Sequence, residues 1–195
     1  MRNKNIYLAV LALFLATFVF ILFSFKTQFS NNKSFTINEH LDQFNLETHK
    51  NELLTFKNLD NYPTMFFFGF LNCPDICPST LLKISNIIEE LGDISEKIKF
   101  FFVTVDPERD NANDLEDYLK NFSEKITGVT GKKNDVYNFL DYMYVHHEKI
   151  FLDEVIFTFD HSSQIYLFDR DGDFFGTISS EESNKMAIEK IKSLF

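Results

Sequence analysis

Apolar residues are distributed unevenly along this chain of 195 residues, and the first zone they define lies at the N-terminus. Residues 6–25 form an almost unbroken apolar run, long enough to cross the hydrocarbon core of a bilayer as one helix. Arg2 and Lys4 precede the run and favour a cytoplasmic N-terminus. No convincing small-x-small cleavage site ends the run. We therefore predict an uncleaved single-pass membrane anchor over residues 1–26 rather than a cleaved signal peptide.

A polar linker over residues 27–43 separates this anchor from residues 44–195, where apolar positions recur with the spacings of short strands and helices. Short apolar runs at 44–46 and 53–56 predict an extra N-terminal hairpin. Further strands are expected at 64–70, 98–105, 126–129, 155–159, 165–168 and 174–176. Helices are expected at 78–91, 113–122, 134–144 and 182–194. Because strands and helices alternate, the pattern predicts an α/β domain with a mixed sheet flanked by helices.

Charge excludes one large class of partner. The formal net charge is -10 and the sequence pI is about 4.9. A nucleic-acid partner requires clustered Lys and Arg that neutralise phosphates, so we expect no nucleic-acid binding.

The two cysteines of the chain, Cys73 and Cys77, lie where the apolar run 64–70 leads into a helix. Positions four apart share one face of a helix, so both sulfurs can face the same pocket. They can form a disulfide or present two thiolates to a soft metal ion. A helix N-terminus and an exposed position would lower the thiol pKa values. A purely stabilising disulfide is the weaker interpretation, because so short a loop removes little entropy from the unfolded chain.

Two thiolates leave a further metal ligand to be found among the histidines, which are His40, His49, His146, His147 and His161. The adjacent pair His146 and His147 is read as solvated residues after a helix. His161 falls between two predicted strands, in a loop that could approach the cysteines. The pattern alone leaves a ligand role and a surface role open for His161. Asp160 could accept the other imidazole N–H and fix its tautomer, or be a solvated acid.

Several motifs in this order resemble one known family. They are 69–78 (Gly-Phe-Leu-Asn-Cys-Pro-Asp-Ile-Cys-Pro), 105–110 (Val-Asp-Pro-Glu-Arg-Asp), 128–131 (Gly-Val-Thr-Gly) and 160–167 (Asp-His-Ser-Ser-Gln-Ile-Tyr-Leu). Together they resemble the SCO/SenC family of copper-binding assembly factors for cytochrome c oxidase. The resemblance implies a thioredoxin-like fold, an N-terminal membrane anchor, and copper bound by Cys73, Cys77 and His161. Leu71-Asn72 departs from the family's usual Thr-His before the first cysteine.

The resemblance also implies a function and a location. The chain would be a membrane-anchored copper chaperone rather than an enzyme. It would receive copper from a donor protein and deliver it to the binuclear copper site of the oxidase's copper-bearing subunit. Its globular domain would lie in the periplasm or an equivalent intermembrane space. Two thiolates and one imidazole suit Cu(I), with Cu(II) also open.

The alternative from another class is a thiol-disulfide oxidoreductase or redox sensor, with Cys73 and Cys77 as a redox-active disulfide. The spacing of three residues between the cysteines, instead of the usual two, counts against it. For the acidic motif, Asp106, Arg109 and Asp110 are expected to cap the following helix and to pair locally.

Overall fold

The structure, a computed structural model, describes residues 13–21, 35–37 and 40–195. The chain divides into two compact units, Met1–Phe35 and Thr36–Phe195, each described here by itself. In the first unit, residues 13–21 are helical and exposed, and the rest of the predicted anchor at 6–25 lies outside the described residues. Among the helices that the structure describes, none is both long and apolar enough to cross a membrane.

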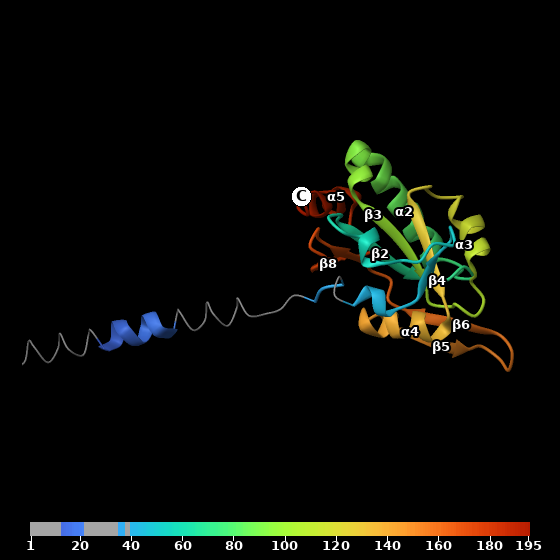
Figure 1. The fold of residues 1–195 in the computed structure, drawn as a ribbon, viewed down its shortest axis with the longest axis horizontal. Coiled ribbons are helices and arrows are strands. Elements are labelled where there is room, and N and C mark those ends of the chain that lie inside the picture. Colours follow the sequence, from blue (N-terminus) through green and yellow to red (C-terminus); the bar gives the residue numbers. More distant parts are fainter. Residues whose placement is uncertain (1–12, 22–34, 38–39) are drawn as a thin grey trace, which may run out of the picture. The chain divides into compact units, whose positions relative to one another are not determined.

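The second unit is built on a six-stranded sheet with the strand order β1-β4-β3-β2-β7-β8 (Figure 1). β2, β3 and β4 are parallel to one another, while β1, β7 and β8 pair antiparallel at the two sides. The strands are β1 (Leu46–Thr48), β2 (Thr64–Gly69), β3 (Lys99–Thr104), β4 (Ile126–Gly131), β7 (Ile165–Phe168) and β8 (Phe174–Ile178). The helices are α2 (Ile76–Leu91), α3 (Ala112–Leu119), α4 (Lys133–Tyr142) and α5 (Asn184–Lys192), with short 3-10 turns η1 (Leu41–Gln43), η2 (Phe56–Asn58) and η3 (Gly92–Lys97). The predicted mixed sheet flanked by helices is confirmed.

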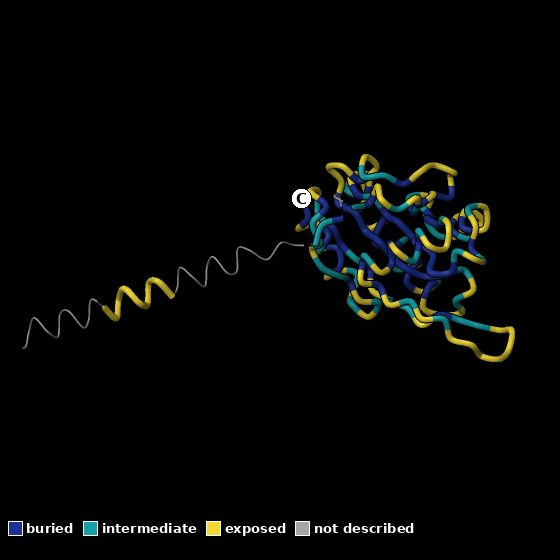
Figure 2. The backbone as a smooth tube through the Cα atoms, turned by 60° about the horizontal axis from the view of Figure 1, so that its bottom comes forward, coloured by how far each residue is buried: buried dark blue, intermediate teal, exposed yellow. Residues whose placement is uncertain are grey.

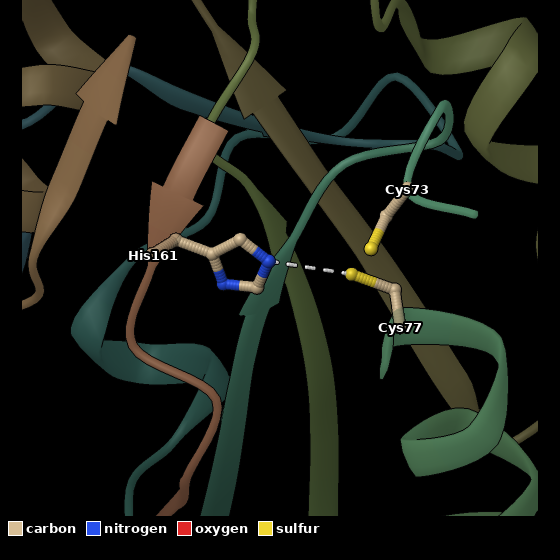
Figure 3. A group of neighbouring side chains, drawn as sticks. All are labelled: Cys73, Cys77 and His161. Carbon is tan, nitrogen blue, oxygen red and sulfur yellow. Dashed lines mark hydrogen bonds between the residues drawn. The ribbon is translucent and has the colours of Figure 1, made fainter. Parts of the chain in front are cut away.

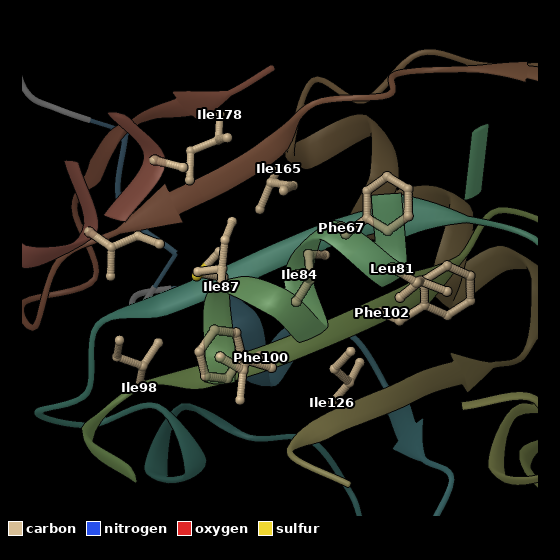
Figure 4. Close-up of a cluster of buried hydrophobic side chains, with 14 of the residues drawn as sticks. Phe67, Leu81, Ile84, Ile87, Ile98, Phe100, Phe102, Ile126, Ile165 and Ile178 are labelled. Carbon is tan, nitrogen blue, oxygen red and sulfur yellow. The ribbon is translucent and has the colours of Figure 1, made fainter. Parts of the chain in front are cut away.

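β2 is buried along its whole length, as its unbroken apolar sequence predicts for a central strand. Successive side chains of a strand point to opposite faces of the sheet. Phe67 therefore packs on the face covered by α2, α3 and α5, in the cluster drawn in Figure 4. Phe66 and Phe68 lie on the other face, against Phe139 of α4, with ring centroids 6.0 and 6.4 Å from it. Both faces of the central strands are thus covered, which fixes where β2 and β3 end.

A separate two-stranded ribbon is formed by β5 (His147–Phe151) and β6 (Phe157–His161). Its strands pair antiparallel, with His147 opposite His161 and Phe151 opposite Phe157. The connection between the strands is exposed and projects from the domain (Figure 2). In the described part of the chain, no ladder of backbone hydrogen bonds joins this ribbon to the main sheet.

Two of the predicted elements differ from the structure. The N-terminal hairpin is present but short: Glu47 bridges Leu53, the Thr48 N–H bonds to the Glu52 carbonyl and the Leu54 N–H to the Leu46 carbonyl, both at 2.8 Å, while β1 also pairs with β4 at the edge of the sheet. The strand predicted at 155–159 begins later, as β6 at Phe157, and extends to His161. Val155 and Ile156, although apolar, lie in the exposed connection of the ribbon.

Candidate metal centre

The cysteines lie in the turn that joins β2 to α2. The N–H of Cys73 bonds to the carbonyl of Phe70 at 3.2 Å, which closes the turn, and α2 then begins at Ile76, two positions earlier than predicted. Cys77 therefore falls in the first helical turn, fully buried, while Cys73 is half-buried. Both are free thiols in the structure.

Gly69, at the end of β2, makes room for the sulfur of Cys77. A Cβ built at this glycine would lie 2.6 Å from Cys77 Sγ and 2.9 Å from Phe102 Cε2. Neither distance is compatible with a real side chain. The thiol is thus packed directly on the backbone of the central strand, between that strand and its own helix.

His161 approaches the cysteines from the ribbon, as the last residue of β6 rather than from a loop (Figure 3). Its Nε2 lies 3.5 Å from Cys77 Sγ, and its Nδ1 lies 2.9 Å from the carbonyl oxygen of Ser162. A carbonyl only accepts hydrogen bonds, so Nδ1 carries the proton and Nε2 keeps its lone pair toward the sulfurs. The Phe70 ring packs edge-on against the imidazole, with centroids 5.7 Å apart.

One potential ligand atom from each of Cys73, Cys77 and His161 lies within 4.8 Å of the others. The structure thus brings together the two cysteines and the histidine that were predicted as ligands, from segments 84 residues apart for Cys77 and His161. Within the described residues, this is the group of ligand-bearing side chains that could hold a metal ion. Two sulfurs and one imidazole nitrogen form a soft ligand set, suited to Cu(I) rather than to hard cations.

The environment of Cys77 contradicts the expected lowering of its thiol pKa. Burial raises the pKa of Cys77 strongly, and the neighbouring Cys73 raises it further, against the smaller lowering by a hydrogen bond from the Phe70 backbone. Desolvation disfavours the thiolate more than the helix start favours it. In the protein without metal, Cys77 is therefore a neutral thiol.

Burial also lowers the pKa of His161. The Ser162 carbonyl and the charge of Asp160 act in the opposite direction, and His146 adds to the lowering. The imidazole is thereby kept neutral, which is the form that binds a metal.

Of the two roles left open for Asp160, the structure shows the solvated acid: His161 Nδ1 is paired with the Ser162 carbonyl, and the Asp160 side chain is exposed. Adjacent residues of a strand point to opposite faces, so Asp160 turns away from the ring of His161. Its carboxylate lies 3.4 Å from Nε2 of His146, in an exposed pair. His147, predicted to be solvated, is instead largely covered: its ring packs on Tyr137 at 4.9 Å between centroids, and its Nε2 lies 2.9 Å from Asp141.

The acidic motif pairs locally, as predicted, but it does not cap α3. Asn111 is the residue whose side chain accepts from the first N–H groups of that helix. Asp106 pairs with Arg109. Asp110 is buried and accepts from the Leu71 N–H at 3.0 Å and from the Thr104 hydroxyl at 2.6 Å.

Tyr118 of α3 is a residue near the site that the sequence did not single out. Its hydroxyl is buried and makes no hydrogen bond to the part of the chain that the structure describes. Burial raises the pKa of Tyr118 to about 12. In the sequence, its helical spacing with Leu115 and Phe122 indicated only a core position, which is why it was missed.

Known proteins of one family are similar to this chain in both sequence and structure. A model of the SCO1/SenC family matches residues 34–195. A SCO2-like protein of Rickettsia prowazekii is 34% identical over 152 residues, which cover 77% of this chain and 74% of that protein. The structure of Bradyrhizobium japonicum ScoI with copper bound is similar with a TM-score of 0.73 and 31% identity, over 78% of this chain and 97% of that one. Yeast Sco1 with copper bound is similar with a TM-score of 0.71 and 31% identity, over 77% and 84% of the two chains.

Proposed function

The chain belongs to the SCO1/SenC family, and we propose that it is a copper chaperone that binds copper through Cys73, Cys77 and His161. The observation that carries this proposal is the approach of these three ligand atoms to within 4.8 Å. The copper-bound structures of the relatives, with their thioredoxin-like fold, support it. By the same family resemblance, the copper is delivered to the binuclear copper site of cytochrome c oxidase during its assembly.

Copper capture in this site requires the loss of thiol protons. Cys77 is neutral before binding, since burial raises its pKa, and a thiol must ionise to become a strong ligand. His161 needs no such change, because its Nε2 already presents a lone pair. The imidazole is the preformed ligand, and the thiols complete the site as copper displaces their protons.

The setting of this activity is part of the proposal. Residues 6–25 anchor the chain in a membrane with the N-terminus on the cytoplasmic or matrix side, which places the copper-binding domain in the periplasm or the equivalent intermembrane space. The partners are a copper donor protein and the copper-bearing oxidase subunit. The continuous apolar sequence of residues 6–25 and the preceding Arg2 and Lys4 support this arrangement.

Copper stoichiometry of the full-length chain tests the site. We expect one Cu(I) per wild-type chain. Loss of a direct ligand in His161→Ala should weaken binding by more than about 100-fold, since even outer-shell partners of metals contribute about 10- to 100-fold. The matched control is His146→Ala, which removes an exposed imidazole near the same ribbon end and should leave the affinity unchanged. Unchanged binding by His161→Ala would reject the three-ligand site.

A thiol-disulfide oxidoreductase or redox sensor is the second candidate, favoured by the closeness of two free thiols. A half-exposed Cys73 beside a buried Cys77 resembles the division between an attacking and a resolving thiol. The raised pKa of Cys77 counts against rapid exchange at that sulfur. Reduction of insulin disulfides by the copper-free chain, retained in His161→Ala, would favour this candidate over the chaperone.

A further inference from the structure

The acidic loop between β3 and α3, residues 105–110, contacts both segments that bear the candidate ligands. On the cysteine side, Asp110 accepts the N–H of Leu71, which lies in the turn that leads to Cys73. The same carboxylate oxygen accepts from Thr104 at the end of β3. The cysteine turn is thereby tied to the central sheet through a buried acid.

On the histidine side, Arg109 contacts the start of β6. Its guanidinium lies over the ring of Phe157, 3.8 Å from the ring centroid, and Nη1 donates to the Phe157 carbonyl at 3.4 Å. Asp106 pairs with the same guanidinium and holds it in place. A further link joins Glu108 to Lys149 of β5 at 3.8 Å. Phe157 begins the strand that ends at His161.

These contacts matter because the ribbon shares no hydrogen-bonded ladder with the main sheet. Its base is held by packing of Phe159 on Phe70, 5.7 Å between centroids, and by the contacts of His147 with α4. Such packing allows the strand to slide or tilt, whereas the hydrogen bond to Phe157 fixes its backbone at one point. Phe157 and His161 are the two ends of the same strand, so the contact of Arg109 at Phe157 bears on where β6 places His161.

We propose that Arg109 is a positioning residue of the copper site, which holds β6 so that His161 faces Cys73 and Cys77. This inference rests on the proposed function, because it assigns a role at the same site. Arginine suits this role since its planar fork can stack on a ring, pair with a carboxylate and donate to a carbonyl together. Lysine keeps the charge but cannot make all three contacts in that geometry.

A double-mutant cycle on copper affinity tests whether Arg109 acts through His161. We expect Arg109→Met to weaken Cu(I) binding by the full-length chain about 10-fold, in the range found for outer-shell partners of metals. In a His161→Ala background the same substitution should have no further effect, because the ligand that Arg109 positions is gone. Arg109→Lys should fall between Arg109→Met and the wild type. X-ray absorption of the copper-loaded Arg109→Met chain should show the two sulfur ligands with a longer and more disordered copper–nitrogen distance than in the wild type.

The matched control is Arg170→Met. Arg170 also lies over an aromatic ring, that of Phe195, with 4.9 Å between the guanidinium carbon and the ring centroid, but it contacts neither ligand-bearing segment. This substitution removes an equivalent stacked cation and should leave copper affinity and the nitrogen ligand unchanged. An equal loss in Arg109→Met and Arg170→Met would overturn the proposal, because the effect would then be a general one of charge or stability.

Hydrogen exchange of the copper-free chain gives a readout that does not depend on the proposed function. We expect Arg109→Met to speed exchange of β5 and β6 amides at least several-fold, with β2 and β3 unchanged. Additive effects of Arg109→Met and His161→Ala on affinity, or unchanged exchange in the ribbon, would refute the role of Arg109. If His161→Ala itself had no effect on copper, the proposed site would fail, while the exchange result would still report whether Arg109 holds the ribbon. If Arg109→Met does not fold, Arg109→Lys carries the same comparisons.

Discussion

Cys77 and His161 face each other across a gap of 3.5 Å, yet they belong to regions built in different ways. Cys77 lies in a helix packed on a central strand that is covered on both faces, and its side chain is fully buried. His161 ends a two-stranded ribbon whose far end is exposed and whose hydrogen bonds stay within the pair. The packing of the core thus fixes the position of the thiols, whereas the position of the imidazole depends on a few side-chain contacts.

This difference has a consequence for metal exchange. A ligand held by few contacts can withdraw at a lower free-energy cost than one held by the core, since regions with little buried apolar surface open most easily. The copper chaperone proposed above would have to release its metal as well as bind it. The ribbon is thus the side of the site from which we expect release to begin.

The largest effect is expected for Phe67→Ala on the core side. Phe67 is 1% exposed and packs on Phe102 beneath α2. Its truncation should lower the free energy of unfolding by about 3–5 kcal/mol, because the buried ring is lost and a cavity remains. Urea denaturation of the copper-free chain measures this. A loss below about 1 kcal/mol would show that the core side is not the rigid partner of the comparison.

Gly69→Ala should come next. The added methyl would lie 2.6 Å from Cys77 Sγ, so either the sulfur or β2 must shift. We expect a loss of about 1–3 kcal/mol in the free energy of unfolding, typical of overpacked cores, together with weaker copper binding. Combining it with Cys77→Ala removes the closest atom and should recover part of the lost stability. A full loss retained in the double variant would point to Phe102 as the clashing group instead.

Asp110→Asn tests, through pH, the buried acid that ties the cysteine turn to the central sheet. Burial raises the pKa of Asp110 to about 6 from the model-peptide value of 3.8, against lowering by its hydrogen bonds from Thr104 and Leu71. The folded state therefore favours the protonated acid, so this contribution to stability is full below 3.8 and is lost as the pH rises through about 6. An asparagine at this position makes no such pH-dependent contribution to stability, because its side chain does not titrate in this range. Relative to the wild type, we expect the variant to gain about 1–2 kcal/mol between about pH 4 and pH 7. Urea denaturation across that range measures the gain, and a difference that stays constant with pH would contradict it.

The smallest effect is expected for Phe151→Ser at the far end of the ribbon. Phe151 is 65% exposed, so its substitution should change the free energy of unfolding by no more than about 0.5 kcal/mol. Copper affinity should stay at the wild-type value, because Arg109 still holds Phe157, the residue opposite Phe151, after the substitution. A loss of stability comparable to that of Phe67→Ala would remove the contrast between the two regions.

The sequence predicted the core side well, because burial on both faces leaves a strong signal. The apolar run at 64–70 predicts β2, and the helical spacing after Pro78 predicts α2, so the cysteine turn between them follows. The ribbon was harder to predict. β5 has mostly polar or exposed residues, so its sequence gives little strand signal. It is a strand because it is hydrogen-bonded to β6.

The candidate site likewise divides into a part that the sequence predicted well and a part that was harder to predict. Cys73 and Cys77 do lie together, but not on one helical face as their spacing predicted, because Cys73 precedes α2 in the turn closed on Phe70. The addition of His161 to them required the family resemblance, since no local pattern connects residues so distant in the chain. Adjacency in sequence left two roles open for Asp160, and the strand decides between them, because neighbours in a strand point apart. The thiol pKa could not be read from the helix start, because it depends on how deeply the tertiary packing buries the sulfur.

The absence of a side chain at Gly69 also decides which sulfur is open to chemical damage. Cys77 Sγ packs against the strand and has no solvent-exposed surface, so an oxidant in solution does not reach it directly. Cys73 is half-buried and is the sulfur that peroxide or an alkylating reagent reaches first. Oxidation of the copper-free protein should therefore begin at Cys73, with Cys77 protected by its close packing on β2.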